Sequence, residues 1–133
     1  MFNTYQEYLS TSRSIAFEKM QQLHEQILNE VCGDEDAEEL YGELIETATR
    51  YAAFRAEWCL WDREMKMNRD ESRTACHNSV IIKLNMLSRY LRMQGHEAKW
   101  RDELGYEEDD KYNRKTIGDF ACYLVFVNSI NAR

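Results

Sequence analysis

The residues best suited to chemistry in this sequence are an arginine, a histidine and an aspartate: Arg73, His77 and Asp119. Arg73 and His77 are four positions apart, which places them on one face of a helix. Asp119 would join them from a later and otherwise apolar helix, with Asp62 or Glu57 as a further carboxylate. Burial and a carboxylate partner would shift the pKa of the histidine in opposite directions, as is common in active sites. Such a site would suit a small hydrolase that acts on a phosphorylated substrate, either a nucleotide or RNA.

The same three residues also have a structural interpretation. A buried ionisable group must be paired to be tolerated, so Arg73, His77 and Asp119 can form a hydrogen-bonded cluster that fixes the register of the helices. This interpretation needs no reaction and no substrate. The sequence favours it over catalysis, so the three residues are a candidate site and not an assigned one.

Motifs for metals and cofactors are missing from the sequence. Helical di-iron proteins use Glu-x-x-His pairs, and none of the three histidines has a glutamate three residues before it. Phosphate-binding loops and dinucleotide fingerprints are missing as well. The four cysteines form no CxxC pair, and their spacing encodes no zinc site with His77. They are expected to behave as small buried hydrophobes: Cys32, Cys59, Cys76 and Cys122. The sequence therefore predicts no metal site and no cofactor.

Two short patterns resemble those of enzymes that act on nucleotides or RNA. Acidic residues at Glu-x-x-Glu spacing between positions 35 and 46 resemble the magnesium-binding glutamates of the all-helical nucleotide pyrophosphatases. The second acidic pair that this family requires matches only Glu107 and Asp110, which fall in a predicted loop. Arg89 and His96 resemble the ribonuclease motif of HEPN domains, but Gly95 would break the helix between them. A solvated helix start and chance spacing explain the two patterns better.

The chain is acidic overall, and its charge is divided into blocks. The formal charge is −7, from 17 basic and 24 acidic residues. Residues 1–46 carry −9, residues 47–101 carry +5 and residues 102–133 carry −3, so we expect the basic block to pack against the first acidic one. The alternative is a nucleic-acid surface in which aromatic and basic residues alternate: Lys83, Arg89, Tyr90, Arg92, Lys99, Trp100 and Arg101. Because a net negative charge repels nucleic acid over distance, we do not expect nucleic acid as a partner.

The composition predicts that helices position all of these residues. Among 133 residues there is no proline and there are only five glycines, so the residues that interrupt helices are nearly missing. Apolar residues recur at steps of three and four over most of the chain. We therefore predict a single all-α domain over residues 1–133, built as an antiparallel bundle of four main helices plus one short helix.

The apolar spacing also predicts where the helices begin and end. The main helices are expected at residues 2–31, 36–65, 73–94 and 113–131, with a polar connection at residues 68–72. One or two short helical turns around Trp100 and Leu104 would be closed by Gly105. Thr4 with Glu7 forms the expected capping box of the first helix, and Asp34 or Asp36 is the expected N-cap of the second. Gly33 and Gly95 are expected to end the first and third helices.

The last predicted helix is apolar all round from Phe120 to Val127. A helix without a polar face is normally covered on every side, so this one is either the central helix of the bundle or meets a second subunit. From this surplus of apolar surface we predict a non-enzymatic interaction protein that self-associates, as a homodimer, through Phe120, Tyr123 and Val127.

The sequence gives no sign of a membrane segment or of export. The longest apolar run has eight residues, far fewer than the roughly 20 that cross a bilayer. The first residues lack the basic, apolar and small-residue order of a signal peptide. We therefore expect a cytoplasmic protein with reduced thiols.

Three short motifs extend over about residues 50–133: Arg73-Thr74-x-x-His77, Asp119-Phe120-Ala121 and Asn128-x-x-Asn131-Ala132-Arg133. In this combination the chain resembles an uncharacterised family of small, all-helical bacterial proteins of unknown function. The resemblance implies a helical bacterial protein and no particular activity.

Overall fold

The computed structural model describes residues 16–58, 60–105 and 114–131. All regular structure within these ranges is helical: α2 (Phe17–Val31), α3 (Glu35–Trp58), α4 (Arg63–Met93), α5 (Lys99–Glu103) and α6 (Arg114–Asn131). The predicted all-α class is confirmed.

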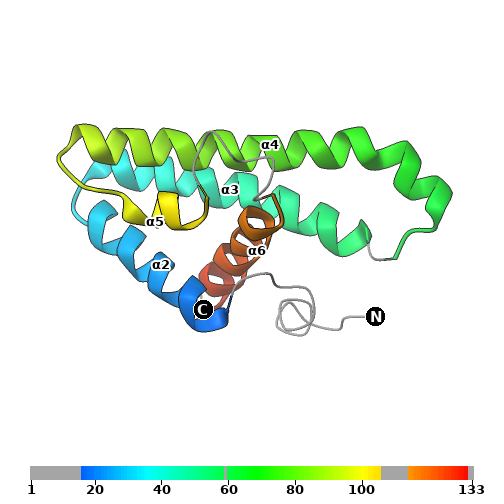
Figure 1. The fold of residues 1–133 in the computed structure, drawn as a ribbon, viewed down its shortest axis with the longest axis horizontal. Coiled ribbons are helices and arrows are strands. Elements are labelled where there is room, and N and C mark those ends of the chain that lie inside the picture. The colour runs from blue at the N-terminus through cyan, green and yellow to red at the C-terminus, as the bar shows by residue number, and fades with distance from the viewer. Residues whose placement is uncertain (1–15, 59, 106–113, 132–133) are drawn as a thin grey trace.

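The helices are arranged around a long hairpin formed by α3 and α4. These two helices run antiparallel along the longest axis of the molecule, and α6 crosses below α3 (Figure 1). α3 makes its most extensive contacts with α4 and its next most extensive with α6. The short helix α5 packs against both α2 and α4. The main helices thus form a bundle in which α3 is the shared partner.

The apolar helix α6 lies in the core of this single chain. Every residue from Ile117 to Val125 is buried, while Phe126 and Val127 are partly buried. Phe120 is 0% exposed and Tyr123 is 3% exposed, so both side chains are covered by other parts of the same chain. This burial explains why the helix is apolar on all sides, since a central helix of the bundle has no face towards solvent. Self-association through Phe120, Tyr123 and Val127 stays a prediction.

Glycine and aspartate set the helix ends where the sequence indicated. Gly33 and Gly95 follow α2 and α4 with φ angles of +84° and +95°, a conformation that glycine adopts without steric cost. Of the two N-cap candidates, Asp34 is the cap of α3, since its carboxylate accepts hydrogen bonds from the backbone N–H groups of Asp36 and Ala37. The short helix near Trp100 is also present, as α5.

The boundary between the second and third predicted helices was wrong. The expected connection at residues 68–72 is helical and belongs to α4, and the chain turns instead between Trp58 and Arg63. Asp62 ends the turn, because its side chain accepts a hydrogen bond from the backbone N–H of Met65 at 2.8 Å and so caps α4. Residues 68–72 are all exposed, because this part of α4 is not covered by another helix, and this explains their polar character.

Some predictions fall on residues outside the described ranges. The first predicted helix is confirmed over Phe17–Val31. Its expected beginning, with the capping box of Thr4 and Glu7, lies outside the described residues, as does the expected acidic loop with Glu107 and Asp110.

Two helical glycines provide a matched test of how closely α6 approaches α3. A methyl group at Gly118 would collide with the Tyr51 hydroxyl and would lie 2.8 Å from Nη1 of Arg55, whereas a methyl group at Gly42 would meet nothing within 4 Å. We expect Gly118→Ala to reduce the free energy of unfolding by about 1–3 kcal/mol through overpacking. Gly42→Ala should raise it by about 0.5–1 kcal/mol, because alanine is the better helix former. Urea denaturation measures both changes, and equal effects of the two substitutions would contradict this packing.

Candidate functional site

A cavity of about 610 Å³ opens beside the predicted site residues. It is bounded by α3, α4 and α6, and its lining residues are Tyr51, Arg55, Trp58, Arg73, Thr74, His77, Arg114 and Lys115. Its volume lies within the range of about 300–1,000 Å³ that is usual for sites of small molecules. The candidate residues Arg73 and His77 therefore share one pocket wall.

His77 is buried and uses both ring nitrogens to hold Arg114. Its Nε2 lies 2.7 Å from the backbone carbonyl oxygen of Arg114, and its Nδ1 lies 3.2 Å from Nη1 of the same residue. Because the carbonyl can only accept, Nε2 carries the hydrogen and donates it, and Nδ1 accepts from the guanidinium. His77 thus links α4 to the first turn of α6 and orients the Arg114 side chain, which also donates to Asn78 Oδ1 at 2.9 Å.

The surroundings of His77 favour its neutral form. Burial lowers the pKa of its imidazole, and the positive charges of Arg114, Arg73 and Arg55 lower it further. The hydrogen bond to the Arg114 carbonyl acts in the opposite direction and only partly offsets these effects. At neutral pH the ring is therefore an uncharged spacer among three guanidinium groups.

Asp119 lies behind the pocket wall. It is 0% exposed and forms an ion pair with Arg55, a residue of α3 that lines the pocket. The sequence predicted that Asp119 would join Arg73 and His77, but its partner is a different arginine. The proposed further carboxylates are not in the wall either, since Asp62 caps α4 and Glu57 is exposed.

Arg73 lies against an aromatic ring at the mouth of the cavity. Its guanidinium carbon is 4.7 Å from the centroid of the Trp58 ring, a cation–π distance. Its Nη2 lies 3.3 Å from the exposed carboxylate of Asp70 on the same helix. Its Nε is buried without a hydrogen-bond partner among the described residues. The hydrogen-bonding groups of Arg73 are therefore not all satisfied by the described residues.

The wall of the cavity is strongly positive. Four of its lining residues are cationic, namely Arg55, Arg73, Arg114 and Lys115, and none of the described lining residues is a carboxylate. The whole chain carries −7, so the local charge is opposite to the overall charge. A concave wall with one sign of charge concentrates the electrostatic field and attracts counter-ions. The arrangement can bind an anion.

Sequence reasoning placed Arg73 and His77 in the site and missed the six other lining residues: Tyr51, Arg55, Trp58, Thr74, Arg114 and Lys115. Asp119 did indicate that one such residue was missing, because a buried carboxylate requires a cation from a facing helix. The sequence pattern does not tell which of the many arginines supplies that cation.

The basic and aromatic residues between positions 83 and 101 do not form a common surface. Arg101 is buried, with Nε donating to Asn85 Oδ1 and Nη1 donating to the Gly105 carbonyl. Trp100 is buried and donates to Glu30, and Lys83 forms an ion pair with Glu43. These residues hold α2, α3, α4 and α5 together, so the alternative of a nucleic-acid surface loses its main support.

Neither a metal cluster nor a membrane span occurs in the described parts of the chain. No three histidine, cysteine, aspartate or glutamate side chains there are grouped to hold a metal ion. No helix within the same ranges is both long and apolar enough to cross a bilayer.

Comparison with protein-family models, curated proteins and solved structures gives no significant match. The function of the pocket must therefore be inferred from its own chemistry.

A second buried histidine lies away from the pocket. His24 of α2 is 3.0 Å from the Tyr41 hydroxyl, which in turn accepts a hydrogen bond from Asn128 of α6 at 3.0 Å. Burial lowers the pKa of His24, and the nearby charge of Glu25 opposes this. The fold thus contains two buried histidines that it holds in the neutral form.

These two histidines predict a fold that weakens in mild acid. Because the pKa of His24 and of His77 is below the ordinary value of 6.5 in the folded state, the unfolded chain binds protons more readily. The contribution of the two histidines to the free energy of unfolding is fully present above pH 6.5. It is lost as the pH decreases through their lower folded-state pKa. Each histidine can contribute a slope of at most about 1.4 kcal/mol per pH unit.

Urea denaturation at several pH values between about 7 and 5 measures this slope. We expect the double variant His24→Gln/His77→Gln to show a flatter dependence over that range than the wild type. A wild-type stability that does not change with pH, or a double variant with the same slope, would contradict the assignment.

Proposed function

We propose that this protein binds a small phosphate-bearing ligand in the cavity between α3, α4 and α6 and does not convert it chemically. The observation that supports this most is the set of four cationic side chains around a cavity of about 610 Å³ that has no carboxylate among its described lining residues. Such a concave grouping of cations attracts an anion.

Three of the four cations are held in place by neighbouring groups. Arg55 is paired with buried Asp119, Arg114 is held by His77 and Asn78, and Arg73 lies over Trp58. A guanidinium group presents several N–H donors in a fixed plane, which suits the oxygens of a phosphate group. Because these side chains are already ordered, little free energy is needed to order them when a ligand binds, and the affinity is higher as a result.

The same contacts argue for binding instead of hydrolysis. A general base needs a free lone pair within reach of the substrate, but both nitrogens of His77 are occupied by Arg114. The carboxylate of Asp119 is buried and paired with Arg55. A hydrolase that uses Arg73, His77 and Asp119 therefore has less support than a binding protein. A cytoplasmic location remains part of this proposal, in keeping with the wide spacing of the cysteines in the sequence.

Phosphate binding can be tested by titrating the protein with ribose 5-phosphate in a phosphate-free buffer and measuring heat by calorimetry. Removing one charged hydrogen bond costs about 1.5–3 kcal/mol, so Arg73→Gln and Arg114→Gln should each reduce the affinity about tenfold or more. The matched control is Lys99→Gln, because Lys99 is 72% exposed and lies outside the cavity. Its affinity should equal that of the wild type.

Two results would contradict the proposal. One is a wild-type protein that binds neither ribose 5-phosphate nor inorganic phosphate at millimolar concentration. The other is an equal loss of affinity in Lys99→Gln and in the cavity variants, which would indicate nonspecific attraction. Thermal melting of each variant without ligand separates lost binding from lost folding.

A further inference from the structure

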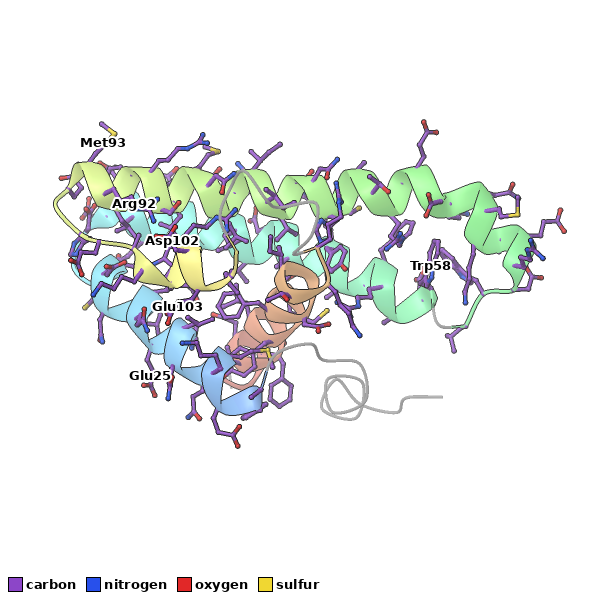
Figure 2. The ribbon with its side chains drawn as sticks, viewed as in Figure 1. Glu25, Trp58, Arg92, Met93, Asp102 and Glu103 are labelled. Atoms are coloured by element: carbon purple, nitrogen blue, oxygen red, sulfur yellow. The ribbon has the colours of Figure 1, made fainter. Side chains whose placement is uncertain are left out.

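A second depression adjoins the cavity at the end of the α3–α4 hairpin where the chain turns from α3 into α4. Its volume is about 330 Å³, and its lining residues are Trp58, Arg63, Lys66, Met67 and Asp70. Trp58 lines both this depression and the cationic cavity. Figure 2 shows this tryptophan between the end of α3 and the first turns of α4. The two spaces therefore share one aromatic wall.

The second depression differs from the first in its chemistry. It combines the indole of Trp58 with Met67, which is 69% exposed, and its two cations are accompanied by the carboxylate of Asp70. The aromatic wall is extended by Trp61, whose ring centroid is 6.0 Å from that of Trp58. Arg69 lies over the Trp61 ring at 5.6 Å. Flat aromatic and apolar surface with a few hydrogen-bonding groups suits a planar, polar ring better than a phosphate.

We propose that the ligand is a single nucleotide, with its phosphate in the cationic cavity and its base against Trp58 in the second depression. This inference rests on the proposed function. A nucleotide carries an anionic group and a planar ring joined by a sugar, which matches two spaces of different chemistry that share one wall. The donors of Lys66 and Arg63 suit the ring nitrogens and carbonyls of a base, and Asp70 suits an exocyclic amine.

The surroundings favour a single nucleotide over a nucleic-acid strand. Proteins that bind single strands use a positively charged groove that follows the backbone over several nucleotides. Here Lys83, Arg92 and Arg101 are engaged with side chains of the same chain. The overall charge of −7 also repels a long polyanion. The positive charge is concentrated around one cavity and the adjoining depression.

The test compares adenosine 5′-monophosphate with ribose 5-phosphate on three proteins: the wild type, Trp58→Leu and Trp58→Phe. Stacking of a base on an aromatic side chain contributes about 1–3 kcal/mol, so the wild type should bind the nucleotide at least about fivefold more tightly than the sugar phosphate. Trp58→Leu should lose this difference and bind the two compounds with about equal affinity, even where the loss of the ring beside Arg73 weakens the binding of both. Trp58→Phe should retain most of the preference, since a phenyl ring still stacks.

The possible results distinguish this inference from the proposed function. Equal wild-type affinity for the two compounds would overturn the base site and leave phosphate binding intact. An equal loss for both compounds in Trp58→Leu would also overturn it, because Trp58 would then act only by positioning Arg73. No binding of either compound would overturn the proposed function itself. Binding of an oligouridylate at least tenfold more tightly than the mononucleotide would overturn the choice of a single nucleotide.

Discussion

The ion pair between Asp119 and Arg55 is the constraint on which the rest of this structure depends. Asp119 is a charged residue within the stretch of α6 from Ile117 to Val125, which is entirely buried and largely apolar. A carboxylate in such a place is tolerated only with a paired cation, and Arg55 of α3 supplies it. The pair therefore fixes how α6 lies against α3. Gly118 supports the same contact, because the missing side chain leaves room for Tyr51 and Arg55.

The geometry of the cavity follows from this arrangement. Once α6 is fixed against α3, its first turn brings Arg114 and Lys115 beside Arg73 and His77 of α4. His77 stays neutral and separates the arginines instead of adding to their charge. The guanidinium groups of Arg55, Arg73 and Arg114 are thus held by neighbouring side chains and still line the cavity. The contacts that stabilise the fold and the contacts that prepare the anion site are thus largely the same.

Much of the fold was predictable from the sequence because it depends on local signals. The absence of proline, the apolar spacing and the glycines at 33 and 95 identify helices and their ends. The turn between α3 and α4 was not predictable in this way, since Trp61 and Met65 continue the apolar spacing of α3 beyond its end at Trp58. Asp62 acts as a cap through its hydrogen bond to the Met65 N–H, and that bond exists only once the turn has formed.

The site was predictable only in part. Arg73 and His77 were identified because one turn of helix separates them, and this relation is visible in the sequence. Arg55 and Arg114 were not, since their roles depend on contacts between helices, and apolar periodicity indicates which face is buried but not which residue lies opposite. The pairing of Asp119 shows the same limit: the sequence indicates that a cation is needed and does not identify it.

The most direct test of the central claim is a nuclear magnetic resonance titration that follows the arginine side-chain N–H signals as ribose 5-phosphate is added. If the cavity binds phosphate, the Nε–H signals of Arg73 and Arg114 should shift in a saturable manner. Arg92, which lies outside the cavity and donates to the Glu97 carbonyl, should not shift. Shifts of equal size at all arginines, or no saturable shift at Arg73 and Arg114, would contradict the account.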